Sequence, residues 1–286
     1  MDALNCSGLD PKVGAESEFI VRIAVLGAGK MGSALARVWA QAGHQVVIGC
    51  RREFTLMSPL ISELGSSIQA MAIPDAASWS EAVALALPWD SRTELAASAD
   101  SLAGKVVLDA MNAYSSYPSV VDLGTTTSSE AIALDIPHTR LVKALNTLQA
   151  RDVLACGREA GSAQRIAVPI CGNDTGAKRV VAALVDDIGF DVVDIGILPN
   201  GRWSEPTGPL FGKNCSASKL MDLARECGVP GLWEDGSQLG CTVGKFCKEI
   251  RVPSGISRDE KNACDIVPFH TAEPWRSSIS AKDPHA

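Results

Sequence analysis

Three glycines near the start of the chain have the spacing of a phosphate-binding loop. Gly27, Gly29 and Gly32 follow the apolar run of residues 21–26. At this spacing the first glycine permits a tight turn, the second lets the backbone approach a pyrophosphate, and the third lets a helix pack closely on the strand. The N-terminus of that helix would add unpaired N–H groups and partial positive charge. We therefore predict that a dinucleotide contacts Gly27, Ala28, Gly29, Lys30, Met31 and Gly32.

Two arginines, Arg51 and Arg52, follow the next apolar run. Chains that bind NAD place an acid about twenty residues beyond the glycine loop, where it holds the ribose 2′-hydroxyl. An acid would repel a 2′-phosphate, whereas a guanidinium binds it through charge-assisted and often bidentate hydrogen bonds. The pair predicts NADP(H) as the cofactor; two solvated loop arginines are the alternative.

Candidate groups for the second half of a reaction are few. Tyr114 and Tyr117 are the only tyrosines in the chain. Reduction of an imine or ketone needs a proton donor, and these two, Tyr114 above all, are the candidates; half-buried structural tyrosines are the alternative. A flavin-like partner would need only alignment of two rings. Asn146 would hold a nicotinamide amide or a substrate carbonyl, or form a turn. Lys143 is expected to face a polar loop or the substrate cleft, because burying a lysine is unfavourable.

Alternating apolar runs and amphipathic segments must position these residues. Strands are predicted at 21–26, 45–50, 66–73, 82–88, 105–114, 140–148, 165–172 and 190–198, and helices at 30–44, from 75, and at 91–104, 129–137, 175–189 and 214–228. This rhythm predicts an α/β fold, a Rossmann-type doubly wound and mostly parallel sheet. Ligands lie beyond the carboxyl ends of such strands, which selects the loops 88–90, 112–117, 146–149 and 196–205.

Composition sets the organisation and the excluded partners. Residues 1–20 are expected to be a flexible extension, 21–212 an NADP-binding domain, and 213–286 a C-terminal helix and irregular tail. A net charge of -7 disfavours nucleic acid and anionic membranes, and the absence of a signal sequence or apolar span favours the cytoplasm. The nine cysteines match no zinc pattern, so no metal site is predicted and free thiols are expected.

Several blocks together resemble one known family. The blocks are IAVLGAGKMGSALA, VVIGCRR, LALPWD, VVLDAMNAY, RLVKALNTL, PICGND and DVVDIGILPNGRWSEPTGPL, across residues 21–211. Their order is similar to that in NADP reductases that depend on the deazaflavin coenzyme F420, a family that includes the cytosolic domain of membrane metalloreductases. The sequence differs at Asn112-Ala113-Tyr114, where the family commonly has Asn-Pro, and after residue 211.

The resemblance implies NADP(H) at residues 27–32, with Arg51 and Arg52 at the 2′-phosphate. It also implies that Pro88, Trp89 and Asn112 lie along the nicotinamide half, and that the protein is a homodimer. The expected function is hydride transfer between NADPH and a small deazaflavin-like, imine or carbonyl partner. The alternatives are an imine or pyrroline-type reductase of a biosynthetic pathway, and a sensor that binds NADP(H) without turnover.

Overall fold

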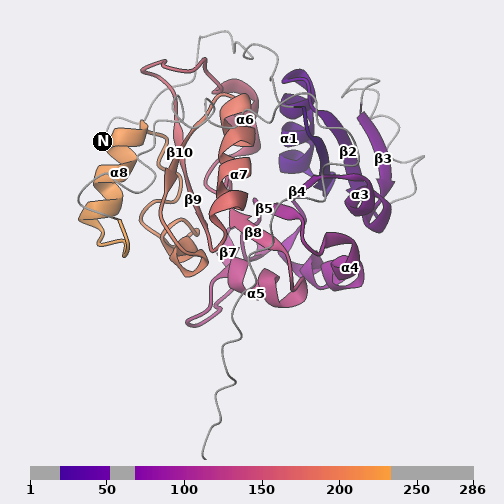
Figure 1. Ribbon diagram of the computed structural model, residues 1–286. Helices are drawn as coiled ribbons and strands as arrows, with labels where there is room; N and C mark the ends of the chain where they lie inside the picture. The colour runs from indigo at the N-terminus through magenta and orange to yellow at the C-terminus, as the bar shows by residue number, and fades with distance from the viewer. Residues whose placement is uncertain (1–19, 52–67, 233–286) are drawn as a thin grey trace, which may run out of the picture. The chain divides into compact units, whose positions relative to one another are not determined.

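The computed structural model describes residues 20–51 and 68–232 (Figure 1). These fall within one compact unit, Met1–Glu249; the second unit, Ile250–Ala286, lies outside the described residues. Arg52, residues 1–19 of the predicted extension and the predicted tail beyond residue 232 also lie outside them. Within the described ranges, no helix combines the length and the apolar character needed to cross a membrane.

Eight strands form one sheet that is parallel over most of its width. In the order β10-β9-β8-β5-β4-β1-β2-β3, the six strands from β8 to β3 run parallel, while β9 pairs antiparallel with β8, and β10 runs parallel to β9. The strands are β1 (Arg22–Leu26), β2 (Gln45–Cys50), β3 (Ile68–Ala72), β4 (Ala82–Leu85), β5 (Val106–Asp109), β8 (Arg140–Lys143), β9 (Ala167–Gly172) and β10 (Asp191–Asp194). The predicted Rossmann-type α/β fold is confirmed.

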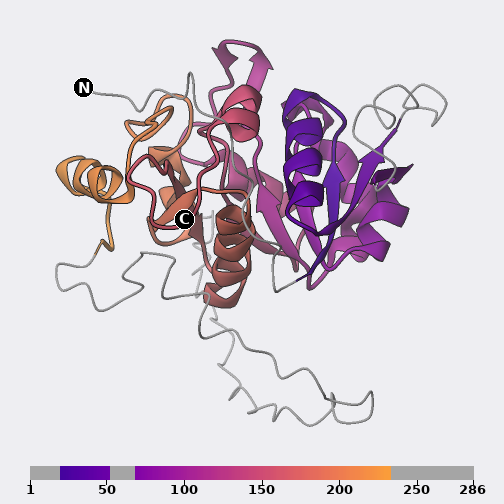
Figure 2. The same cartoon turned by 90° about the horizontal axis from the view of Figure 1, so that it is seen from above.

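Helices connect the strands and cover both faces of the sheet (Figures 1 and 2). The α-helices are α1 (Lys30–Gln41), α3 (Ile73–Trp79), α4 (Ala99–Leu102), α5 (Ser128–Asp135), α6 (Ala150–Ala155), α7 (Thr175–Asp187) and α8 (Ala217–Glu226). Two 3-10 helices are η1 (Trp89–Ser98) and η2 (Leu198–Trp203).

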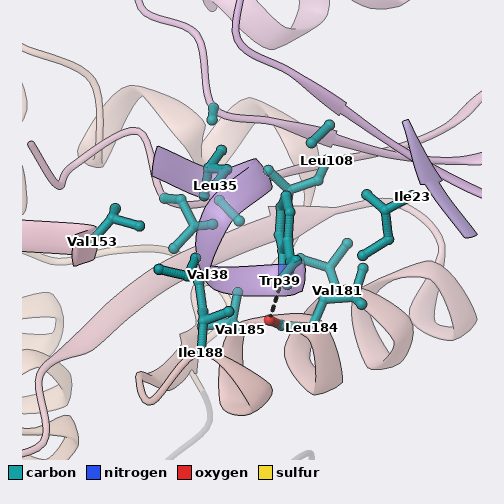
Figure 3. Close-up of a cluster of buried hydrophobic side chains, with 14 of the residues drawn as sticks. Ile23, Leu35, Val38, Trp39, Leu108, Val153, Val181, Leu184, Val185 and Ile188 are labelled. Atoms are coloured by element: carbon teal, nitrogen blue, oxygen red, sulfur yellow. Dashed lines mark hydrogen bonds between the residues drawn. The ribbon is translucent and has the colours of Figure 1, made fainter. Parts of the chain in front are cut away.

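Side chains alternate between two hydrophobic cores, as the pleat of a strand requires. Ile23 and Val25 of β1 join the core formed with α1, α6 and α7, whereas the intervening Ala24 and Leu26 join the core formed with α3, α4 and α5. Trp39 of α1 is fully buried in the first core, and its indole N–H donates to the Leu184 carbonyl of α7 at 2.9 Å (Figure 3). The apolar runs therefore read as strands buried on both faces.

The end of the described chain is part of the same packing. Helix α8 lies where the sequence predicts a helix, and Leu220 and Ala224 on it are buried against β9 and β10. Ser216 caps its N-terminus by accepting from the Lys219 N–H at 3.5 Å. This helix covers the sheet face opposite α7, because Ala167 and Cys171 of β9 point to α8 while their neighbours point to α7.

The structure differs from the sequence prediction at several points, among them the following three. The predicted helix 91–104 is the 3-10 helix η1 followed by one turn of α4. The segment is rich in Ser, Thr and Asp, which favour caps and turns over helix interiors. The predicted loop after β5 contains a hairpin, β6 (Tyr114–Ser116) and β7 (Ser119–Val120). Cys156 is disulfide-bonded, so the expectation of free thiols is wrong there; the described Cys50, Cys171, Cys215 and Cys227 are not disulfide-bonded.

Candidate functional site

The glycine loop joins β1 to α1, and its three glycines have different surroundings. Gly27 has a φ of +119°, and a Cβ there would lie 2.4 Å from the Ala86 carbonyl oxygen. A Cβ on Gly32 would lie 2.0 Å from the Gly27 carbonyl oxygen, so both positions exclude any side chain. A Cβ on Gly29 would meet nothing within 4 Å. The two outer glycines thus allow close packing, and the middle one faces open space.

Helix α1 begins beside that open space with an uncapped N-terminus. Gly29 is its N-cap residue and no side chain caps the first turn. The first N–H groups of a helix have no partner within the helix, and together they attract anions. The loop therefore offers what a dinucleotide pyrophosphate needs: room at Gly29 and a row of backbone donors.

Arg51 lies directly after β2 and is paired in the structure. Its Nη1 lies 2.5 Å from Glu94 Oε1, and its Nη2 donates to Ser91 Oγ at 3.2 Å. Both partners belong to η1, and the arginine side chain is 58% exposed. A phosphate bound by the Arg51 guanidinium would therefore have to displace Glu94 from it, or share the guanidinium with Glu94.

A cavity of about 360 Å³ lies at the carboxyl ends of β1, β4, β5 and β8, and it brings three of the four predicted loops together. Its walls include Pro88, Trp89, Asn112, Tyr114 and Asn146, five residues that the sequence singles out. The lining residues are Met31, Ala86, Leu87, Pro88, Trp89, Asp90, Ala110, Met111, Asn112, Tyr114, Ser115, Ser116, Tyr117, Asn146 and Leu148. We refer to it as the interstrand cavity.

The hairpin β6–β7 brings both tyrosines to this cavity. The rings of Tyr114 and Tyr117 meet edge to face, with centroids 5.3 Å apart at 69°. Tyr117 is 80% exposed, whereas Tyr114 is partly buried. Burial, and secondarily Tyr117, raise the pKa of Tyr114 above its usual value, so this phenol carries its proton throughout the neutral range.

Asn112 and Asn146 form a reciprocal pair at the polar end of the cavity. Asn112 Nδ2 donates to the Asn146 carbonyl at 2.8 Å, and Asn146 Nδ2 donates to Asn112 Oδ1 at 3.1 Å. Asn146 Nδ2 also donates to the Ser204 carbonyl at 2.7 Å, which ties the fourth predicted loop to the cavity. The preceding residue, Leu145, has a φ of +63°, a conformation that β- and γ-branched side chains rarely adopt.

Lys143 faces polar groups of two loops, the first of its two expected environments, and it is not among the residues that line the interstrand cavity. It is 1% exposed and points into a cluster of oxygens between β5, β8 and α5. Its Nζ lies 3.3 Å from Asp109 Oδ2 and donates to the Met111 carbonyl at 3.2 Å and to Ser128 Oγ at 2.8 Å. A buried lysine is tolerable when it is paired and fully hydrogen-bonded, and these oxygens supply both conditions.

Sequence reasoning missed the rest of this cluster. Asp109 is fully buried and accepts hydrogen bonds from the Met111 N–H at 2.9 Å and from the Ser129 hydroxyl at 2.5 Å. Glu205 Oε1 accepts from both the N–H and the hydroxyl of Ser128, at 2.6 Å each. Two signals in the sequence could have indicated it: Asp109 ends an apolar strand, in LDAMN, and Glu205 lies in the predicted loop 196–205. The cluster fixes the loop that carries Asn112.

A second cavity of about 370 Å³ also borders the hairpin. Its walls come from the returning strand and the loop after it, from the start of α5, and from the segment after η2. The lining residues are Ala113, Val120, Val121, Asp122, Leu123, Gly124, Thr125, Thr126, Thr127, Arg202, Glu205, Pro206 and Thr207. The hairpin thus forms part of the wall of both cavities.

Comparison with known proteins places this geometry in a family. The family model described as NADP oxidoreductase, coenzyme F420-dependent, matches residues 22–113. A crystal structure from Arthrobacter sp. FB24, provisionally described as an F420-dependent NADP reductase, is 32% identical with a TM-score of 0.57. The match covers 64% of this chain and 87% of that one. The chain belongs to the family of F420-dependent NADP oxidoreductases.

Two further relatives define how far the family likeness extends. The crystal structure of a hypothetical protein from Sinorhizobium meliloti is 31% identical, with a TM-score of 0.62, over 68% of this chain and 95% of that one. Metalloreductase STEAP3 of Rattus norvegicus is 27% identical over 185 residues, 63% of this chain. This chain spans only 35% of that relative. The family model ends at residue 113, so the tyrosine hairpin, Lys143 and Asn146 lie beyond its match.

Proposed function

We propose that this protein is an NADP(H)-dependent oxidoreductase that transfers a hydride between NADPH and a small organic partner bound in the interstrand cavity. The observation that carries the proposal is the placement of that cavity. Met31 of α1 and Pro88 after β4 line it together with Asn112 and Asn146 from the neighbouring strand ends. A dinucleotide whose phosphates lie at Gly29 would extend its nicotinamide toward this cavity.

Each part of the chain has a role in this proposal. The backbone of residues 27–32 binds the pyrophosphate, while Arg51 and Arg52 bind the 2′-phosphate. Pro88, Trp89 and Asn112 orient the nicotinamide, which supplies the hydride when the cofactor is bound. Trp89 is 6% exposed, so it can form a fixed wall against which a ring is held.

NADP(H) is proposed over NAD(H) because Cys50, the last residue of β2, is followed by Arg51 and not by an acid that would hold a ribose 2′-hydroxyl. Family membership supports the same choice. Among the described residues, Glu94 opposes this choice, because its carboxylate is hydrogen-bonded to Arg51 in the structure. The protein is further proposed to be a homodimer, which light scattering of the eluting protein would test.

A second candidate function is reduction of a C=N bond, as in an imine or pyrroline-type reductase. The observation that favours it is Tyr114, a protonated phenol in the wall of the cavity. In this reaction the Tyr114 hydroxyl would give its proton to the nitrogen while carbon receives the hydride. A deazaflavin partner would not need this proton, so the two functions differ in their dependence on Tyr114.

The test follows nicotinamide absorbance while purified protein is mixed with NADPH and one acceptor at a time. The acceptors are a deazaflavin, a cyclic imine, a ketone and, because of the metalloreductase relative, a ferric chelate. We expect oxidation of NADPH with at least one organic acceptor and slower oxidation of NADH. Binding of NADPH without oxidation by any acceptor would favour a sensor, and absence of NADPH binding would refute both functions.

A further inference from the structure

The side chain of Asn146 has one hydrogen-bonding atom that the protein leaves unused. Asn146 is 1% exposed, and its Oδ1 is buried with no donor within hydrogen-bond reach among the described residues. The residue also lines the interstrand cavity. A buried carbonyl oxygen without a donor has lost its hydrogen bonds to water and gained none in return, so it calls for an explanation.

The orientation of this amide is determined by its surroundings. Both hydrogens of Nδ2 are committed, one to Asn112 Oδ1 and one to the Ser204 carbonyl. Rotating the amide by half a turn would bring Oδ1 against those two acceptors, so the flipped form is excluded. The backbone is also held, because the Asn146 carbonyl accepts from Asn112 and Leu145 has a φ of +63°. The acceptor is therefore held in one position, on a residue that lines the cavity.

We propose that Asn146 Oδ1 accepts a hydrogen bond from an N–H group of a molecule bound in the interstrand cavity. The proposal rests on the proposed function and adds a restriction to it. Since neither Nδ2 hydrogen is available, Asn146 offers nothing to a substrate carbonyl oxygen. Two groups have the required chemistry: the carboxamide of the nicotinamide ring, and the N–H of a C=N substrate that binds already protonated and therefore takes no proton from Tyr114. No proton is transferred to Asn146; it only orients the donor.

The first arm of the test asks whether the carboxamide is the donor. Isothermal titration calorimetry compares NADP⁺ with 3-acetylpyridine adenine dinucleotide phosphate, which has a methyl group in place of the amide nitrogen. If the carboxamide donates to Oδ1, wild-type protein binds NADP⁺ about tenfold more tightly, as expected for one buried hydrogen bond. In Asn146→Leu the ratio falls to about one. A substitution that merely disturbs the site would weaken the binding of both ligands equally, so it would not change the ratio of their affinities.

The second arm asks whether the second substrate is the donor, using the complex with NADP⁺. Ligand-observed NMR compares pyrrolidin-2-one with cyclopentanone, two neutral rings that differ by an N–H in place of a CH₂. If substrate nitrogen donates to Oδ1, pyrrolidin-2-one binds several-fold more tightly to wild type, and the preference is lost in Asn146→Leu. Asn146→Ala is the second variant should Asn146→Leu fail to fold.

The outcomes separate the two sources and the two proposals. Preference for the amide only in the first arm assigns Oδ1 to the cofactor, and preference only in the second assigns it to the substrate. If NADP⁺ binds wild type and neither arm shows a preference that Asn146 variants lose, this inference is overturned and the proposed function stands. If NADP⁺ does not bind wild type, the proposed function falls and this inference falls with it.

Discussion

The pairing of Arg51 with Glu94 makes opposite predictions for two substitutions. Arg51→Gln removes the guanidinium that would bind the 2′-phosphate, so NADPH affinity should fall while NADH affinity stays the same. Glu94→Gln removes the carboxylate that lies 2.5 Å from Arg51 Nη1, so NADPH affinity should rise while NADH is again unaffected. The Glu94 variant leaves Arg51 itself in place.

The magnitudes follow from exposure. A hydrogen bond to a charged group contributes about 1.5–3 kcal/mol, but Arg51 is 58% exposed, which places the loss for Arg51→Gln near the lower end, roughly tenfold in affinity. The pair with Glu94 is itself solvent-exposed, and such pairs contribute about 0.2–1 kcal/mol. Releasing Arg51 from that pair should therefore tighten NADPH binding by up to about fivefold.

Calorimetric titration of the three proteins with NADPH and NADH at low ionic strength measures these effects. The NADPH preference should shrink as salt is added, because exposed charges are screened. Equal thermal midpoints of the three proteins would exclude general unfolding as the cause. Equal weakening of NADPH and NADH by Arg51→Gln, or weaker NADPH binding by Glu94→Gln, would refute the assignment of Arg51.

Three further predictions concern the buried lysine, the cavity and the N-cap of α7. Lys143→Met leaves Asp109 buried without its cation and should lower the free energy of unfolding in urea by about 3–5 kcal/mol. Tyr114→Phe should slow imine reduction at least about tenfold while the Kd of NADPH is unchanged. Arg140 lowers the pKa of Asp174 from the ordinary value of 3.8 to about 2. The ionised Asp174 should therefore stabilise the fold above pH 3.8, and this stabilisation should be lost as pH falls toward 2. In thermal melts, Asp174→Asn should lower the midpoint above pH 3.8 and have less effect near pH 2.

Matched variants make these predictions selective. Lys219→Met changes an exposed lysine and should leave the urea midpoint unchanged. Tyr117→Phe keeps the ring of the exposed tyrosine and should affect imine reduction less than Tyr114→Phe does; the reverse order would remove Tyr114 as donor. An Asp174→Asn protein whose melting difference from wild type grows below pH 3.8 would contradict the role given to Arg140.

Much of the fold and of the cavity follows from local sequence patterns. Continuous apolar runs predict strands buried on both faces, and the rule that ligands lie beyond parallel strand ends brings Pro88, Asn112 and Asn146 to one place. The glycine spacing likewise predicts which positions are closed to a side chain. These features depend either on residues close in sequence or on the sheet topology, and the rules for connecting parallel strands leave few possible topologies.

The features that the sequence did not predict depend on pairing across the chain. The burial of Lys143 is tolerable only because Asp109 and Ser128 lie around it, and no pattern along the sequence states that they meet. The contact between Arg51 and Glu94 joins residues 43 positions apart. The antiparallel pairing of β8 with β9 has the same origin, since an apolar run alone does not give the direction of a strand.

The hairpin that carries both tyrosines constrains how this enzyme can change. Tyr114 and Tyr117 line one cavity, while Val120 on the returning strand lines the other. An insertion, deletion or register shift within these few residues would alter both volumes at once. Efforts to broaden substrate range, in the laboratory or during evolution, are therefore better directed at single side chains of the hairpin than at its length, because side-chain replacement can enlarge one cavity and leave the other intact.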